Sequence, residues 1–195
     1  METRRVWTIG HSNHPLEKLL KLLRRHEIEA VADVRSHPYS QYAPQFDLDG
    51  LAKAAREAGM LHVYLGKELG GRPRGDCYYD ERGHVLYSEV ARSEVFLGGI
   101  GRLENGLARY RLAILCAEEN PAGCHRRLLV GRVLGARGVA VWHIRGDGSA
   151  VSEEELAAAE PADDQMLLFQ EMEAEAWKSI PLVSPKKRQN SSSAF

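Results

Sequence analysis

The chain has 195 residues, of which 44% are hydrophobic and 27% are charged, and its formal net charge is −1. This balance is typical of a globular protein and excludes a largely disordered chain. The longest apolar run has six residues, far fewer than the roughly 20 that a membrane-spanning helix needs. The apolar run near the N-terminus is too short for the core of a signal peptide, so we expect a cytoplasmic protein. Three cysteines in a chain of this length do not suggest a disulfide scaffold.

Charge is unevenly distributed along the chain. Residues 1–150 carry 22 basic and 18 acidic side chains, whereas residues 151–178 carry one lysine and nine acids. Residues 179–195 carry three basic side chains and no acid. We therefore expect an α/β domain over 1–150, an acidic helical appendage over 151–178 and a disordered tail over 179–195. The basic excess of the first segment is too small to favour nucleic acid as the partner.

The predicted strands and helices alternate along the chain. Short apolar runs predict buried strands, and apolar residues spaced by three and four predict helices. In chain order, the predicted elements are strand Val6–Gly10, a helix opening at His14-Pro15 with leucines 16, 19, 20 and 23 as its apolar stripe, strand Ala30–Val34, helix Leu51–Ala58, strand His62–Leu65, a Gly- and Arg-rich loop over 66–87, a helical region Ser88–Leu107, strand Leu112–Ala117, helix Cys124–Arg137, strand Val139–Ile144 and helix Gln165–Trp177.

Local signals refine two of these helices. Asp47 or Asp49 is positioned to cap the helix over Leu51–Ala58, and Gly59 follows its end. Three glycines, at positions 98, 99 and 101, interrupt the Ser88–Leu107 pattern, so we expect two helices there. The alternation as a whole predicts a single α/β domain with a mostly parallel sheet of about five strands, flanked by helices in a Rossmann-like three-layer arrangement.

Polar segments follow the predicted strands. If the strands are parallel, these segments share the carboxyl edge of the sheet, where open α/β sheets bind ligands. They are Gly10–His14, Asp33–Pro38, Gly66–Arg72, Glu118–Arg126 and the pair His143 and Arg145. The strongest is Pro121–Arg126, because a helix N-terminus favours an anion and lowers the pKa of a thiol there. We therefore predict an enzyme that binds a small anionic ligand, phosphate- or nucleotide-like, at this edge.

The candidate residues divide into two groups by chemistry. Carboxylates, imidazoles and a thiol at strand ends are typical of catalytic groups, and we assign this role to His11, Asp33, Glu118 and Cys124. Arginines, imidazoles and a hydroxyl at the same edge are expected to bind the ligand; these are Ser12, Arg35, Arg72, His125, Arg126 and His143. The sequence identifies no cofactor and does not fix the reaction.

Two other readings of the chain stay open. The chain has no Walker A motif, no G-x-G-x-x-G and no C-x5-R loop, and the absence of a known catalytic motif is consistent with a non-catalytic nucleotide-sensing or nucleic-acid-associated module. Seven residues separate Cys116 from Cys124, not the two to four of a zinc knuckle, so no metal ligands are assigned. A folded loop can still bring these cysteines together as a redox disulfide, or as a metal site with His11, His125 and His143.

The combination of these motifs resembles a known family, the bacterial and archaeal domain of unknown function 488. The matching segments are Thr8–Ser12, Asp33–Ser36 with Pro38 and Ser40, Leu69–Gly71, the Phe96–Leu103 spacer, Leu115–Glu118, Pro121 with Cys124–Arg126, and His143-Ile144. The resemblance spans roughly residues 5–146. The chain departs from the pattern at Ala122-Gly123, where a bulky residue and an arginine often stand. The resemblance supports the predicted site and implies no reaction.

Overall fold

The computed structural model describes residues 4–160, 177–180 and 183. Its strands form one six-stranded sheet in the order β3-β2-β4-β1-β5-β6. The strands are β1 (Arg5–Gly10), β2 (Ala30–Asp33), β3 (Leu61–Tyr64), β4 (Leu112–Cys116), β5 (Ala140–Ile144) and β6 (Ala150–Ser152). Strands β1 to β5 run parallel, and β6 pairs antiparallel with β5 at the edge.

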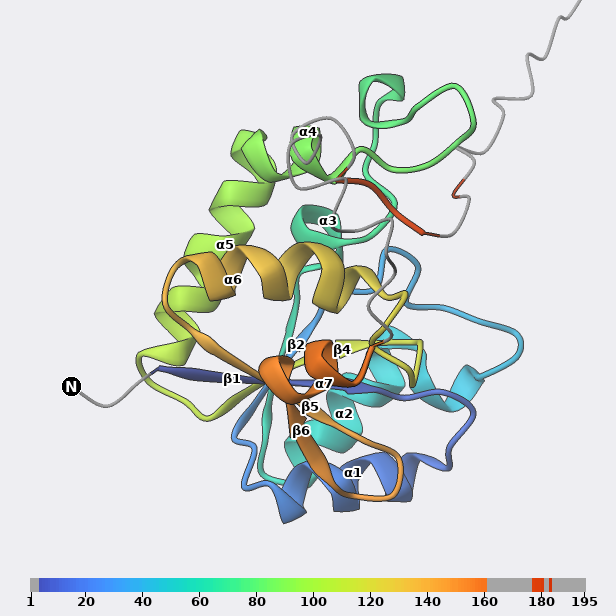
Figure 1. Cartoon of the computed structure of the whole chain (residues 1–195). Coiled ribbons are helices and arrows are strands. Elements are labelled where there is room, and N and C mark those ends of the chain that lie inside the picture. The colour runs from blue at the N-terminus through green and yellow to red at the C-terminus, as the bar shows by residue number, and fades with distance from the viewer. Residues whose placement is uncertain (1–3, 161–176, 181–182, 184–195) are drawn as a thin grey trace, which may run out of the picture.

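Helices cover both faces of the sheet (Figure 1). The α-helices are α1 (Leu16–Arg25), α2 (Leu48–Glu57), α3 (Gly66–Leu69), α4 (Tyr87–Arg92), α5 (Glu94–Leu107), α6 (Arg132–Ala136) and α7 (Glu153–Ala159). Three other helical segments of the described chain are η1 (Pro44–Phe46), η2 (Asp76–Tyr78) and the π-helical η3 (Arg126–Gly131), which runs directly into α6. Helices α1 and α2 lie on one face, and α3 to α6 lie on the other. This confirms the predicted single α/β domain with a Rossmann-like three-layer arrangement.

Strand β4 is a continuous apolar run that is buried on both faces of the sheet. Its side chains alternate between the two cores: Leu112, Ile114 and Cys116 pack on the α5 and α6 side, and Ala113 and Leu115 pack on the α1 and α2 side. A central strand of a covered parallel sheet is buried on both faces, so polar residues are excluded from it. Cys116, the last residue of β4, therefore lies at the carboxyl edge of the sheet and on the face covered by η3 and α6.

The helical region before β4 consists of two helices, but the glycines do not separate them. The break lies at Ser93, whose hydroxyl accepts a hydrogen bond from the Phe96 amide at 3.3 Å and donates one to the Val90 carbonyl at 2.8 Å. The three glycines lie inside α5. At α2 the preceding residue is Asp47, as expected, but its carboxylate makes no cap hydrogen bond to the helix. It accepts instead from the Ser40 amide at 3.1 Å.

The chain beyond β5 adds a strand and a helix that the sequence did not indicate individually. Strand β6 extends the sheet, and Ser152 and Glu155 form a capping box that begins α7. The predicted helix over 165–177 lies outside the described residues except for Trp177, and so does the predicted tail except for residues 179, 180 and 183. No helix in the described part of the chain is long and apolar enough to span a membrane.

Candidate functional site

A cavity with a volume of about 730 Å³ lies at the carboxyl edge of the sheet. Segments that follow β1, β2, β3 and β4 all contribute to its wall, and Ser179 and Val183 add to it from the C-terminal part of the chain. Four of the five predicted polar segments therefore meet in one place. The fifth, at the end of β5, is absent from the wall.

The predicted site residues divide between this cavity and the protein interior. Those in the wall are His11, Ser12, Arg35, Arg72, Glu118 and His125. Those outside the wall are Asp33, Cys124, Arg126 and His143, all of which are buried. Cys116, which the sequence suggested only for a disulfide or a metal site, lies in the wall. The cysteine in the cavity wall is therefore Cys116 and not the predicted catalytic Cys124, which has no exposed surface.

Arg35 is held by a buried carboxylate. Its Nε donates to Asp33 Oδ1 at 2.9 Å and its Nη2 to Asp33 Oδ2 at 2.6 Å, a bidentate pair with both side chains almost fully buried. The remaining Nη1 donates to the Phe46 carbonyl at 2.8 Å. Burial alone would raise the pKa of Asp33, but the hydrogen bonds and charge of Arg35, with a contact from His62, lower it. Asp33 is therefore ionised at neutral pH and positions Arg35.

His11 lies beside this pair as a neutral imidazole. Its Nδ1 donates to the Ser12 carbonyl at 2.7 Å, so Nε2 carries the lone pair and accepts from Arg35 Nη1 at 3.3 Å. The ring stacks on Phe46 with centroids 4.3 Å apart. Burial, aided by the positive charge of Arg35, lowers the pKa of His11 to about 4. His11 is therefore neutral at physiological pH, with the lone pair of Nε2 directed at Arg35.

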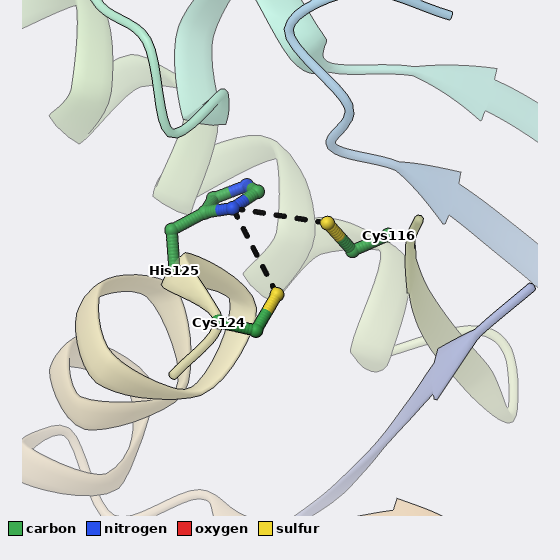
Figure 2. A group of neighbouring side chains, drawn as sticks. All are labelled: Cys116, Cys124 and His125. Carbon is green, nitrogen blue, oxygen red and sulfur yellow. Dashed lines mark hydrogen bonds between the residues drawn. The ribbon is translucent and has the colours of Figure 1, made fainter. Parts of the chain in front are cut away.

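Cys116, Cys124 and His125 form a compact cluster (Figure 2). The loop that follows β4 brings the start of the helical segment back beside the end of that strand. His125 Nδ1 lies 3.8 Å from the Cys116 sulfur and 3.9 Å from the Cys124 sulfur, while Nε2 is 3.1 Å from the Val34 carbonyl. A Cβ at Gly71 would lie 2.7 Å from the His125 ring, so the ring packs here because position 71 is glycine.

The two thiols of this cluster have unequal pKa values. A hydrogen bond from Cys124 lowers the pKa of Cys116 and outweighs the effect of burial. The same hydrogen bond, together with burial, raises the pKa of Cys124. Burial alone would lower the pKa of His125, but contact with Cys124 raises it. The cluster therefore combines groups that suit thiol chemistry or metal ligation, and two of its three members face the cavity.

Arg126 and His143 make hydrogen bonds inside the protein, close to β1 and β5. The Arg126 guanidinium donates to the carbonyls of Glu118 and Glu119, the latter at 2.7 Å, and so holds the loop after β4. His143 Nδ1 lies 2.8 Å from the Thr8 hydroxyl and Nε2 lies 2.8 Å from a Glu153 carboxylate oxygen. The structure therefore does not bring these two predicted ligand-binding residues into the cavity.

Two other structural features were not predicted: three further cavity-lining residues and an ion pair made by Arg145. Tyr87, Ser179 and Val183 line the cavity although none lies in a segment that follows a strand. Arg145, at the end of β5, makes a bidentate pair with Glu119 at 3.0 Å for both contacts. This pair braces the loop after β4 from the outside while Arg126 braces it from within.

A comparison with known protein families places the chain in one of them. The model of the domain of unknown function DUF488 matches residues 15–133, which is more than half of the chain. No curated protein and no solved structure matches the chain. The matched range includes the segments after β2, β3 and β4 that build most of the cavity wall, together with the Cys116, Cys124 and His125 cluster. The chain therefore belongs to the DUF488 family.

Proposed function

We propose that the protein is an enzyme that binds a small anionic ligand, phosphate- or nucleotide-like, in the cavity at the carboxyl edge of the sheet. The observation that carries the proposal is the convergence of four separate strand-end segments on one cavity of about 730 Å³. This is the position at which open parallel α/β sheets bind ligands. The volume lies within the range of roughly 300–1,000 Å³ that is usual for small-molecule sites.

Arg72 is the residue best suited to contact the anion. Its side chain is exposed in the cavity wall, and its backbone amide donates to the Ser36 hydroxyl at 2.9 Å, which fixes the position of the loop. Arg35 also lines the cavity, but the Asp33 carboxylate already neutralises its charge. A guanidinium can bind phosphate or carboxylate oxygens through two parallel hydrogen bonds. Arg72 is therefore the principal anion contact in this proposal, and Arg35 is a buried positioning group.

His11 and Glu118 are the proposed proton-transfer groups. His11 is neutral at physiological pH because burial keeps its pKa low, and Glu118 is an exposed carboxylate on the loop after β4. Both lie in the cavity wall, within the same volume as Arg72. Asp33 takes part only through Arg35, because its carboxylate is fully buried and bonded to that guanidinium.

The first test measures thermal stability in the presence of inorganic phosphate, nucleoside monophosphates and simple carboxylates. A ligand at 100 times its dissociation constant adds about 2.7 kcal/mol to the free energy of unfolding, and each kcal/mol raises the melting temperature by roughly 2–4 °C in a protein of this size. We expect one anion class to raise the melting temperatures of the wild type and Arg74→Gln equally. The same anions should leave the melting temperature of Arg72→Gln unchanged. Arg74 is exposed and absent from the wall, so it is a matched control.

The outcome separates the proposal from its alternatives. An anion that binds and is chemically converted, with conversion lost in Glu118→Gln, supports an enzyme. Binding without conversion of any phosphate- or nucleotide-like ligand supports a non-catalytic sensing module that uses the same cavity. If no anion raises the melting temperature, or if Arg72→Gln responds as the wild type does, the anion proposal is wrong.

A further inference from the structure

We propose that Cys116, Cys124 and His125 bind a zinc ion whose fourth coordination position opens into the cavity. The three ligand atoms lie within 4.8 Å of one another, and the two nitrogen–sulfur distances are 3.8 and 3.9 Å. A tetrahedral zinc ion with bonds of about 2.3 Å to sulfur and about 2.0 Å to nitrogen separates these atoms by roughly 3.5 Å. A shift of a few tenths of an ångström would therefore bring both nitrogen–sulfur distances to this value.

The tautomer of His125 supports this assignment independently. The Val34 carbonyl can only accept a hydrogen bond, so the contact at 3.1 Å places the proton on Nε2. In the neutral ring Nδ1 then carries the lone pair, and Figure 2 shows this nitrogen facing the two sulfur atoms. Metal-binding histidines almost always donate their other ring N–H to a carbonyl or a carboxylate in this way.

The chemistry of the ligands favours zinc over the harder cations. Two thiolates and one imidazole form a borderline-soft set, which suits zinc, whereas magnesium and calcium require oxygen ligands. Two thiolates also neutralise the charge of a divalent ion, which matters because both cysteines are buried. Binding displaces the thiol protons to solvent, so the net charge of the buried cluster stays close to zero.

The surroundings of the cluster indicate an open rather than a closed site. Cys116 and His125 lie in the cavity wall, whereas Cys124 lies behind them with no exposed surface. Three protein ligands with an open fourth position are typical of catalytic zinc, while structural zinc has four protein ligands. The open position would accept water or an oxygen atom of a ligand in the cavity. The assignment goes beyond anion binding and does not depend on it.

The test uses the full chain, reduced, freed of metal with a chelator and then titrated with Zn²⁺ or Co²⁺. We expect one metal ion per chain in the wild type and in Cys77→Ser, whose cysteine is exposed and lies outside the cluster. The Co²⁺ form should show thiolate-to-cobalt charge transfer and the strong visible bands of tetrahedral cobalt. Cys116→Ser, Cys124→Ser and His125→Gln should each weaken binding by more than the roughly 10–100-fold that loss of an outer hydrogen-bond partner costs.

A second measurement needs no variant and so is independent of folding defects. When zinc is bound, only Cys77 should react with an alkylating reagent. On chelation Cys116, which lines the cavity, should become reactive as well, whereas Cys124 should stay protected by burial. Failure of the reduced wild type to bind either ion, or binding that is unchanged in Cys116→Ser, would overturn the zinc proposal. Protein that takes up no metal and contains a Cys116–Cys124 disulfide would identify a redox pair instead. Because no anion is added, these results are separate from those of the anion screen.

Discussion

Arg35 and Arg126 are both buried, yet their guanidinium groups have different surroundings. Arg35 faces a carboxylate and lies in the cavity wall, whereas Arg126 donates to the Thr8 hydroxyl and to two loop carbonyls. The sequence correctly placed both at the carboxyl edge, because strand ends follow from apolar runs. It could not predict which arginine faces the ligand, since the direction of a side chain depends on the path of the loop that it contacts.

The Asp33–Arg35 pair should contribute strongly to stability. Removing one partner of a buried ion pair leaves an unpaired charge and typically costs about 3–5 kcal/mol. We expect Asp33→Asn to lower the free energy of unfolding by an amount in this range, as measured by urea denaturation at pH 7. Asp49→Asn, which changes an exposed carboxylate on α2, is the control and should change it far less. Equal effects of the two substitutions would contradict a stabilising role for the pair.

The same pair predicts a specific dependence on pH. Because folding lowers the pKa of Asp33, its stabilising effect is complete above the unfolded value of about 3.9 and is lost as the pH falls through the lower folded value. The difference in unfolding free energy between wild type and Asp33→Asn should therefore be constant near neutral pH and shrink below about pH 4. A difference that grows on acidification would show that the pKa of Asp33 is raised.

At the scale of elements, the sequence predicted the five parallel strands because each contains a short, largely apolar run. It missed β6 as a strand because three residues cannot establish a period. It also attributed the break between α4 and α5 to glycines, although Ser93 causes it. The convergence of Cys116 and Cys124 was left open for a related reason, since the conformation of residues 117–123 decides whether two cysteines at this spacing meet.

The glycines of α5 differ in their surroundings, which leads to a paired prediction. A Cβ at Gly99 would lie 2.7 Å from side-chain atoms of both Glu68 and Leu69, whereas a Cβ at Gly98 would have no atom within 4 Å. Gly98→Ala should stabilise the protein by up to about 1 kcal/mol through helix propensity. Gly99→Ala should destabilise it by roughly 1–3 kcal/mol through overpacking between α5 and α3. Thermal melts of both variants test this, and stabilisation by Gly99→Ala would refute the close contact.

At the scale of the whole molecule, the C-terminal part of the chain returns to the domain. The Trp177 indole donates to the Leu128 carbonyl at 2.9 Å and packs edge-on against Tyr87. The amide of Ser179 donates to the Val85 carbonyl and its hydroxyl accepts from the Val85 amide, both at 2.8 Å. Lys178 pairs with Asp80 at 3.1 Å. These contacts tie the segment to the loop before α4 and to the helical segment after Cys124.

This docking predicts unequal effects of two substitutions in the segment. Substituting a fully buried aromatic side chain by alanine costs roughly 3–5 kcal/mol. Because Trp177 is only half-buried, we expect Trp177→Ala to lower the free energy of unfolding by less, about 1–3 kcal/mol. Ile180 is 67% exposed, and Ile180→Ala should leave the free energy of unfolding nearly unchanged. Chemical denaturation of both variants provides the measurement. If Trp177→Ala were as stable as the wild type, the segment would not contribute to the fold in solution.

Ser179 and Val183 also line the cavity, so ligand binding and the docking of the C-terminal segment share a surface. Coupling between two binding events is reciprocal. A ligand that contacts the docked segment favours docking by some factor, and loss of docking lowers the affinity for the ligand by the same factor. If the proposed ligand binds in this cavity, the docking of residues 177–180 therefore depends on whether the cavity is occupied. Limited proteolysis detects release of the C-terminal segment from the domain. It would therefore report whether the cavity is filled without any knowledge of the reaction.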